Sequence, residues 1–252
     1  MLSFCSGLGT RDYVMTRRRW IADEVSNEHA ALTGTHAQHL IRVLRARVGQ
    51  EFDIVANGVL RRGRIASISE NRVDFDLGEE VPTAISANLT LLLSIFKFDR
   101  MEWAIEKCTE LGAAKIVPVI ARRTDSHLAS ASVKRVERWR RLALQASEQS
   151  RRGTPPEFAD PIRLSDAVNL TANLRIVLAE TEDQSTIQEV LDSADGKTEI
   201  LLAIGPEGGW TEDELQLFLT KGWRSASLGP TILRAETAAI AATVIAISAL
   251  NR

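Results

Sequence analysis

The second half of the chain alternates short, continuously apolar segments with helical segments, and this alternation restricts the fold more than any other feature. A strand that is apolar on both sides has to be covered on both faces, which is typical of parallel sheets joined by helices. The sequence therefore predicts an α/β domain with a parallel sheet, where ligands bind beyond the carboxyl ends of the strands. We expect strands over 89–96, 115–119, 174–179, 199–204 and 225–228, and helices over 100–111, 132–150, 211–219 and 236–250.

The first half has the alternating pattern of a small β domain. Asn57 and Gly58 both tolerate positive φ, so they predict a tight hairpin turn. Leu40, Val43 and Leu44 have helical spacing and predict one inserted helix. We expect strands over 51–56, 59–69 and 72–77, a helix over 36–45, a boundary at 79–83, a β-barrel over 15–82 and the α/β domain over 83–252.

Composition excludes several classes of protein. The two cysteines form no CxxC pair and the four histidines form no recognisable ligand set, so we expect neither a disulfide scaffold nor a metal site. No apolar run has the length of a membrane span, and the N-terminus lacks the basic lead and apolar core of a secretory signal. We therefore expect a cytoplasmic protein. Residues 1–14 have the character of a disordered leader, and Met15 is an alternative start.

Charge is segregated along the chain although the formal net charge is only -2. The segments 11–64 and 121–163 each hold ten basic residues, against six and five acidic ones, whereas 170–220 holds eleven acidic and two basic residues. Such segregation can give a nearly neutral protein a basic face for phosphates. Arginine outnumbers lysine by 25 to six, which suits contacts with nucleic acid, although a GC-rich genome gives the same ratio.

The most informative segment is the loop over 205–214, Gly-Pro-Glu-Gly-Gly-Trp-Thr-Glu-Asp-Glu, which follows a predicted strand. Its glycines let a ligand approach the main chain, and Thr211 with Glu214 has the spacing of a capping box that begins a helix. Acidic residues at 212–214 already occupy the positive end of that helix dipole, so a phosphate would be repelled. Adenosine carrying a sulfonium fits this loop. The alternative is a plain strand-to-helix turn.

A second loop of the same character spans 228–238, Leu-Gly-Pro-Thr-Ile-Leu-Arg-Ala-Glu-Thr-Ala. Glu236 favours the N-terminus of the helix that follows, whereas Arg234 opposes the helix dipole, and a cation in that place usually has another task. The alternative is an ion pair of Arg234 with Glu236 or with a second subunit. The terminal helix is apolar nearly all round, which predicts burial on several sides and a homodimer.

Together the two loops resemble the RsmE family of SPOUT RNA methyltransferases, which methylate uridine N3 in the 16S ribosomal RNA. Further stretches agree in order and spacing: HLIRVLR over 39–45, EKCTELG over 106–112, RR over 122–123 and ASEQSRR over 146–152. The resemblance runs from about Arg17 to the end of the chain. Ala235 and Trp210 depart from the family pattern, which has threonine and phenylalanine there, and neither change removes a charged group.

The resemblance implies a SPOUT domain with a trefoil knot, an N-terminal PUA-like RNA-binding β-barrel and a homodimer. The implied partner is 16S ribosomal RNA or the small ribosomal subunit, and the implied target is uracil-1498 in the decoding region. S-adenosylmethionine (SAM) is the implied cofactor, without a metal or a membrane. The expected cofactor contacts are Glu180, Gly205, Pro206, Glu207, Gly208, Gly209, Leu228, Gly229, Ile232, Leu233 and Thr237.

Arg234 is the residue that we expect to stabilise charge on the uracil carbonyl oxygens as N3 attacks the methyl group, and Glu236 is the second catalytic candidate. A covalent mechanism through Cys108 is not expected, because that cysteine lies on a predicted amphipathic helix. Two other functions stay open: methylation of another ribosomal or transfer RNA base, and a non-catalytic RNA-binding assembly factor. The expected RNA contacts are Arg17, Arg18, Arg19, Arg42, Arg45, Arg122, Arg123, Arg151 and Arg152, with the basic helix over 132–150 as a further candidate surface.

Overall fold

The computed structural model describes residues 19–81, 88–150, 152 and 154–252. The chain divides into two compact units between Pro82 and Thr83, and each is described below by itself. The predicted leader, the alternative start at Met15, the junction around 82–87 and three of the expected RNA contacts (Arg17, Arg18 and Arg151) lie outside the described residues.

The N-terminal unit is a six-stranded sheet in the order β1-β4-β5-β6-β3-β2. Its pairs are antiparallel except for β1 with β4. The predicted hairpin joins β4 to β5, with Asn57 and Gly58 at φ values of 51° and 80°. Phe75, Leu32 and Ile54 are fully buried at the centre of its core. The strands are β1 (Arg19–Ile21), β2 (Glu24–Ser26), β3 (His29–Thr33), β4 (Glu51–Ala56), β5 (Val59–Ser69) and β6 (Arg72–Glu80).

The predicted helix over 36–45 is present in a different form. It begins as α1 (Gly34–Gln38) and continues as a π-helix, η1 (His39–Val43). The wider turn, closed by the Leu44 amide donating to the His39 carbonyl at 3.1 Å, rotates the later residues out of register. Leu40 is therefore buried while Val43 is 64% exposed, so the predicted common face for these two residues is wrong.

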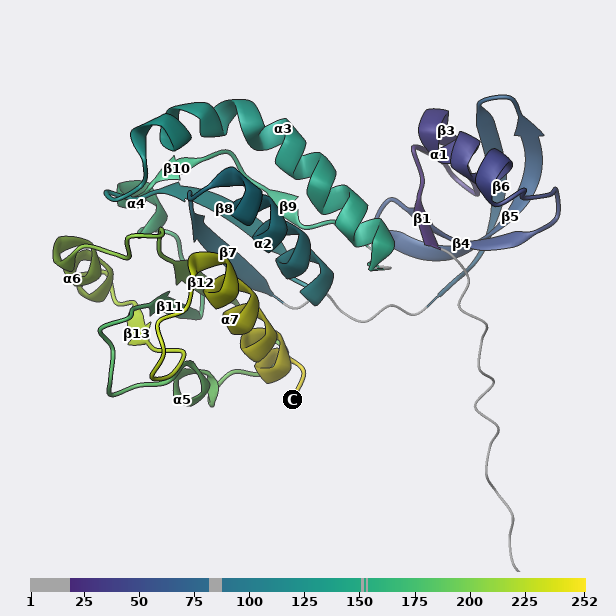
Figure 1. Ribbon diagram of the computed structural model, residues 1–252. Coiled ribbons are helices and arrows are strands. Elements are labelled where there is room, and N and C mark those ends of the chain that lie inside the picture. The colour runs from purple at the N-terminus through teal and green to yellow at the C-terminus, as the bar shows by residue number, and fades with distance from the viewer. Residues whose placement is uncertain (1–18, 82–87, 151, 153) are drawn as a thin grey trace, which may run out of the picture. The chain divides into compact units, whose positions relative to one another are not determined.

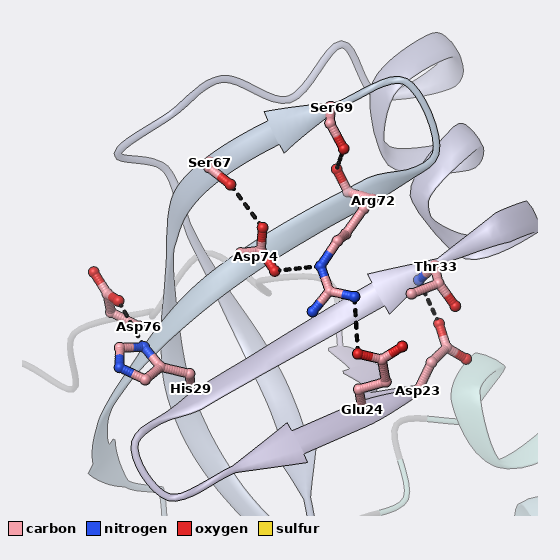
Figure 2. Close-up of polar contacts among 9 residues, drawn as sticks. All are labelled: Asp23, Glu24, His29, Thr33, Ser67, Ser69, Arg72, Asp74 and Asp76. Atoms are coloured by element: carbon pink, nitrogen blue, oxygen red, sulfur yellow. Dashed lines mark hydrogen bonds and ion pairs between the residues drawn. The ribbon is translucent and has the colours of Figure 1, made fainter.

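Polar side chains connect three strands of this unit (Figure 2). Arg72 on β6 donates from Nε to Asp74 at 2.7 Å and from Nη1 to Glu24 on β2 at 2.8 Å. Ser67 on β5 donates its hydroxyl to the other carboxylate oxygen of Asp74 at 2.7 Å. The hydrogen bond from Ser67, and after it the one from Arg72, hold the pKa of Asp74 below its ordinary value.

The C-terminal unit has the predicted parallel sheet, in the order β10-β8-β7-β12-β11-β13, with β9 beside β8 (Figure 1). All its strand pairs are parallel. The strands are β7 (Leu89–Ser94), β8 (Lys115–Ile120), β9 (Glu157–Phe158), β10 (Ile162–Arg163), β11 (Leu174–Leu178), β12 (Ile200–Ile204) and β13 (Arg224–Ala226).

Alternate residues of the four longest strands, β7, β8, β11 and β12, enter two different cores, which explains why these strands are continuously apolar. On β12, Ile200, Leu202 and Ile204 face the core that includes α2, α3, α5 and α7, whereas Leu201 and Ala203 face the core that includes α4 and α6. The helices are α2 (Phe98–Leu111), α3 (Ser126–Gln149), α4 (Leu164–Ala167), α5 (Ile187–Leu191), α6 (Glu212–Thr220) and α7 (Ala235–Leu250).

The five predicted strands and four predicted helices of this unit are confirmed, with shifted ends. The largest shift is at α3, which begins six residues before the predicted position because Asp125 caps it by accepting from the amides of His127 and Leu128. The short elements β9, β10, α4 and α5 were not predicted.

The terminal helix α7 packs against α2, which lies beside it in Figure 1. Ala239, Ala242 and Ala246 are fully buried, as the predicted burial requires, but Val244 is 46% exposed. Within the described part of the chain, every helix is too short or too polar to span a lipid bilayer.

The Asp74 network predicts that the stability of the N-terminal unit depends on pH. Because the pKa of Asp74 is lowered on folding, its contribution is fully present above the unfolded carboxyl pKa near 4 and is lost as the pH falls through the folded value. We expect Asp74→Asn to cost roughly 0.5–1 kcal/mol at pH 7 and to approach the wild type in acid. Denaturant unfolding at several pH values measures both effects.

Asp76→Asn is the matched control, since Asp76 lies on the same strand. Among the described residues, its one ion-pair partner is His29, which is exposed. We expect a smaller loss for this control. A loss for Asp74→Asn that is the same at neutral and at acidic pH would contradict the assignment.

Candidate active site

Three loops meet at the carboxyl end of the C-terminal sheet and enclose one cavity. They follow β11, β12 and β13, which are neighbours in the sheet. The cavity has a volume of about 410 Å³, which is in the range of small-ligand sites. Its wall comes mainly from 178–181, 204–210 and 226–235, with Arg100 and Arg123 from elsewhere in the chain. The two glycine loops of the sequence are therefore adjacent.

The loop after β12 is shaped by Trp210. Its indole is buried and donates from Nε1 to the Leu178 carbonyl at 3.0 Å, which ties this loop to the end of β11. A Cβ at Gly205 would lie only 3.3 Å from the indole ring, and Gly209 has a φ of 68°, so the turn favours glycine at both positions. The departure from the family pattern at Trp210 is thus accommodated by the fold.

The predicted capping box at the start of α6 is confirmed. Thr211 accepts from the Glu214 amide at 3.3 Å, and the Glu214 carboxylate accepts from the Thr211 amide at 2.8 Å. Glu214 also accepts from the backbone amide of Arg122 at 2.7 Å. The carboxylates of this first turn therefore occupy the positive end of the helix and disfavour a phosphate there.

Arg122 and Arg123 have different environments although they are adjacent. Arg123 donates from Nη1 to the carbonyls of Gly208 at 2.7 Å and Trp210 at 3.2 Å, so its guanidinium supports the wall of the cavity. Arg122 is 70% exposed at its side chain and pairs with exposed Asp213 at 3.1 Å. Arg122 is therefore the more accessible of the two for an RNA phosphate.

Arg234 lines the cavity from the loop after β13 and is the N-cap residue of α7. The alternative of an ion pair with Glu236 is not formed, because Glu236 is buried and its nearest described cation is Arg100, 3.8 Å away. Among the described residues, no carboxylate pairs with the Arg234 guanidinium, so its charge is available to a ligand in the cavity.

Nearly all of the predicted cofactor contacts border this cavity. The exception is Thr237, which lies on the exposed side of α7 and does not line the cavity. The catalytic candidate Glu236 is buried and does not line the cavity either. Arg100, from the first turn of α2, was missed by sequence reasoning. Arg100 could have been identified in the same way as Arg234, because it is also a cation at the N-terminus of a predicted helix. The predicted contacts in the wall are Glu180, Gly205, Pro206, Glu207, Gly208, Gly209, Leu228, Gly229, Ile232 and Leu233.

The other expected RNA contacts are distributed over both units. Arg42 lies in η1, and Arg45 follows it with a φ of 50°, unusual for a residue with a side chain. Arg19 lies on β1 and is partly buried. Arg152 donates to the carbonyls of Thr109 and Ala113 at 2.8 Å at the end of α2, and burial lowers its pKa to about 10. The structure thus gives Arg152 a role in the fold.

Cys108, on α2, is buried in the core and contacts Thr243 of α7. Burial raises the pKa of its thiol to about 12, and Thr243 donates a hydrogen bond to its sulfur at 3.4 Å. A protonated and inaccessible thiol is a poor nucleophile, which agrees with the expectation that no covalent cysteine mechanism operates. Among the described residues, no three His, Cys, Asp or Glu side chains form a group that would hold a metal ion.

Comparison with known proteins gives matches over most of the chain. A family model described as "RNA methyltransferase domain" matches residues 83–247, and one described as "RNA methyltransferase PUA domain" matches residues 32–78. Two curated relatives are named ribosomal RNA small subunit methyltransferase E. The relative from Rickettsia conorii is 34% identical, and the match covers 86% of this chain and 88% of the relative. The relative from Synechocystis sp. is 31% identical, and the match covers 90% of this chain and 75% of the relative.

A solved structure extends this similarity to the fold. The crystal structure of a ribosomal RNA small subunit methyltransferase E from Neisseria gonorrhoeae, bound to S-adenosyl methionine, has a TM-score of 0.79 and 28% identity, covering 90% of this chain and 95% of its own. The six-stranded N-terminal unit is thus PUA-like, and the parallel C-terminal sheet matches the methyltransferase domain. With its two domains, its cavity of glycine loops and these matches, the chain belongs to the RNA methyltransferase family that includes ribosomal RNA small subunit methyltransferase E.

Proposed function

We propose that this protein transfers the methyl group of SAM to N3 of a uridine in 16S ribosomal RNA, in the decoding region of the small ribosomal subunit. The observation that supports SAM binding is the cavity of about 410 Å³ bordered by the loops after β11, β12 and β13. The chain is a SAM-dependent RNA methyltransferase, as expected for its family. The choice of uridine N3 rests on the sequence resemblance.

The residues of the cavity fit an adenosine that carries a positive charge. The two glycine loops, with their backbone amides and carbonyls, form much of its wall, and Glu180 and Glu207 border it. Such donors and acceptors suit the edge of an adenine, ribose hydroxyls and an ammonium group. The acidic first turn of α6 offers nothing to a phosphate. We propose that the wall residues predicted from the sequence hold SAM.

The bound cofactor supplies an electrophilic methyl group, and the chain's residues supply position and charge. Uridine N3 carries a proton at neutral pH, and negative charge spreads onto the flanking carbonyl oxygens as that proton leaves. Arg234 lines the cavity without a described carboxylate partner, so we assign it to these oxygens. When the site holds uridine N3 in line with the methyl group of SAM, a bimolecular reaction becomes an effectively unimolecular one.

We assign the RNA backbone to exposed arginines of both domains. Arg122 in the methyltransferase domain and Arg42 and Arg45 in the PUA-like domain present guanidinium groups that suit phosphates. Such contacts supply affinity and register without reading the sequence. A cytoplasmic location agrees with a ribosomal substrate, and a trefoil knot at the C-terminal segment stays a prediction from the resemblance.

The substrate assignment is tested in a strain that lacks this gene. We expect small-subunit RNA from the deletion strain to lose one N3-methyluridine in the decoding region, and the purified protein with SAM to restore it. Mass spectrometry of nuclease fragments locates the modification. Loss of a different methylated base would identify another target, and intact methylation together with undetectable SAM binding would favour a non-catalytic assembly factor.

The role of Arg234 predicts a loss of turnover without a loss of cofactor affinity. We expect Arg234→Ala to lower kcat by about 10²–10³-fold, as is typical when a preorganised donor to developing charge is removed, and to leave the Kd for SAM near its wild-type value. Single-turnover methylation and calorimetry measure the two quantities. Arg224→Ala, which changes an exposed arginine on β13, is the control. Full turnover by Arg234→Ala removes this residue from the mechanism.

We also propose a homodimer that covers the exposed side of α7. Val244 on α7 and Trp103 on the adjacent helix α2 are both about half exposed in the single chain. We expect Val244→Glu to shift the protein from dimer to monomer in size-exclusion chromatography with light scattering, because a charge at the centre of an apolar contact is costly. Leu219→Glu is the control, since Leu219 on α6 is equally exposed. A wild-type monomer would refute the dimer.

A further inference from the structure

Glu236, one of the two catalytic candidates, is buried without a full set of partners. The residue is 5% exposed, and its Oε2 atom accepts no hydrogen bond from the described part of the chain. Its Oε1 lies 3.8 Å from Nε of Arg100, which is an ion pair too long to be a hydrogen bond. The N-terminus of α7 favours a carboxylate at this position. Its environment is thus polar on one side, toward α2.

Arg100 connects Glu236 to the opposite wall of the cavity. Its guanidinium donates from Nη1 to Glu207 Oε1 at 2.8 Å while Nε faces Glu236. Glu207 belongs to the loop after β12, and Glu236 belongs to the first turn of α7, directly after the loop that follows β13. Arg100 itself lines the cavity. One guanidinium therefore spans the two glycine loops that form the two sides of the site.

The placement of Arg100 is unfavourable for the fold alone. It lies in the first turn of α2, where the helix dipole repels a cation. The planar fork of a guanidinium can contact two carboxyl groups in different directions, which a lysine ammonium on its flexible stem does less well. The two carboxyl groups offset the unfavourable position; Glu207 lies in the loop after β12, and Glu236 lies on α7.

We propose that Arg100 is a positioning residue for methyl transfer, and that Glu236 acts through Arg100 as its buried anchor. In this assignment, Arg100 holds the loops after β12 and β13 at the separation that binds SAM. Glu236 does not take the proton from uridine N3, because its carboxyl group is buried behind the cavity wall. This inference rests on the proposed function, since it assigns a task within that site.

The first test removes the guanidinium. We expect Arg100→Ala to raise the Kd for SAM by about 10–100-fold, the factor that corresponds to losing a hydrogen bond between charged groups, and to lower kcat as well, because the methyl donor is displaced. Arg100→Lys keeps the charge and should restore part of the affinity. Calorimetry with SAM and single-turnover methylation give the two constants, and thermal unfolding shows whether each variant is folded.

Lys107→Ala is a closely matched control. Lys107 lies on the same helix and likewise bridges two carboxylates, those of Glu106 at 2.7 Å and Glu110 at 2.8 Å, but it does not border the cavity. We expect this variant to bind SAM and to turn over like the wild type. A double variant, Arg100→Ala with Glu236→Gln, should bind SAM little worse than Arg100→Ala, since both changes remove the same contact.

The second test separates an anchor from a general base. If Glu236 is an anchor, Glu236→Gln weakens SAM binding several-fold and leaves the shape of the pH–rate profile unchanged. If Glu236 is the base, Glu236→Gln removes the acidic limb of that profile and leaves SAM affinity intact, which would overturn the proposal. So would Arg100→Ala with wild-type affinity and turnover. Failure of the wild type to bind SAM at all would refute the proposed function instead.

Discussion

The parallel pairing of β11 with both β12 and β13 is the interaction on which the site depends. Ile176 at the centre of β11 pairs with Leu202 on one side and with Arg224 on the other. Because all three strands run in the same direction, their carboxyl ends lie at one edge of the sheet, and the loops that leave them are adjacent. Three loops spread over about 50 residues of the sequence thereby become the walls of one cavity.

The shape of these loops depends on side chains that contact the protein itself. Trp210 connects the loop after β12 to Leu178, Arg123 holds two carbonyls of the same loop, and Arg100 reaches from this loop to α7. Each of these residues satisfies backbone or carboxyl groups that would otherwise be left unpaired at the edge of a cavity, which is costly. Loops rich in glycine need such supports, since their glycines contribute no side-chain packing.

The arginines show why composition alone is an ambiguous guide to RNA binding. Arg152 is occupied at the end of α2, Arg123 supports the cavity wall, and Arg138 forms two hydrogen bonds of 2.7 Å with Glu102 across two helices. Only some of the basic residues in the segment 121–163 thus have an accessible guanidinium, Arg122 among them. A charge count includes all of them equally, whereas a phosphate contacts only those whose guanidinium is exposed.

The sequence by itself determined the class of each domain and the position of the two glycine loops. Continuously apolar strands, a hairpin of Asn57 and Gly58, and the capping box of Thr211 and Glu214 are local patterns, so their physical meaning does not depend on distant residues. The tertiary structure decided whether Val43 is buried, because a π-helix rotates its side chain into solvent. It also decided which cation lies nearest to Glu236. Arg100 is 107 residues from Glu207 and 136 from Glu236, and a guanidinium meets carboxyl groups at such separations only because strand order and helix packing bring them together.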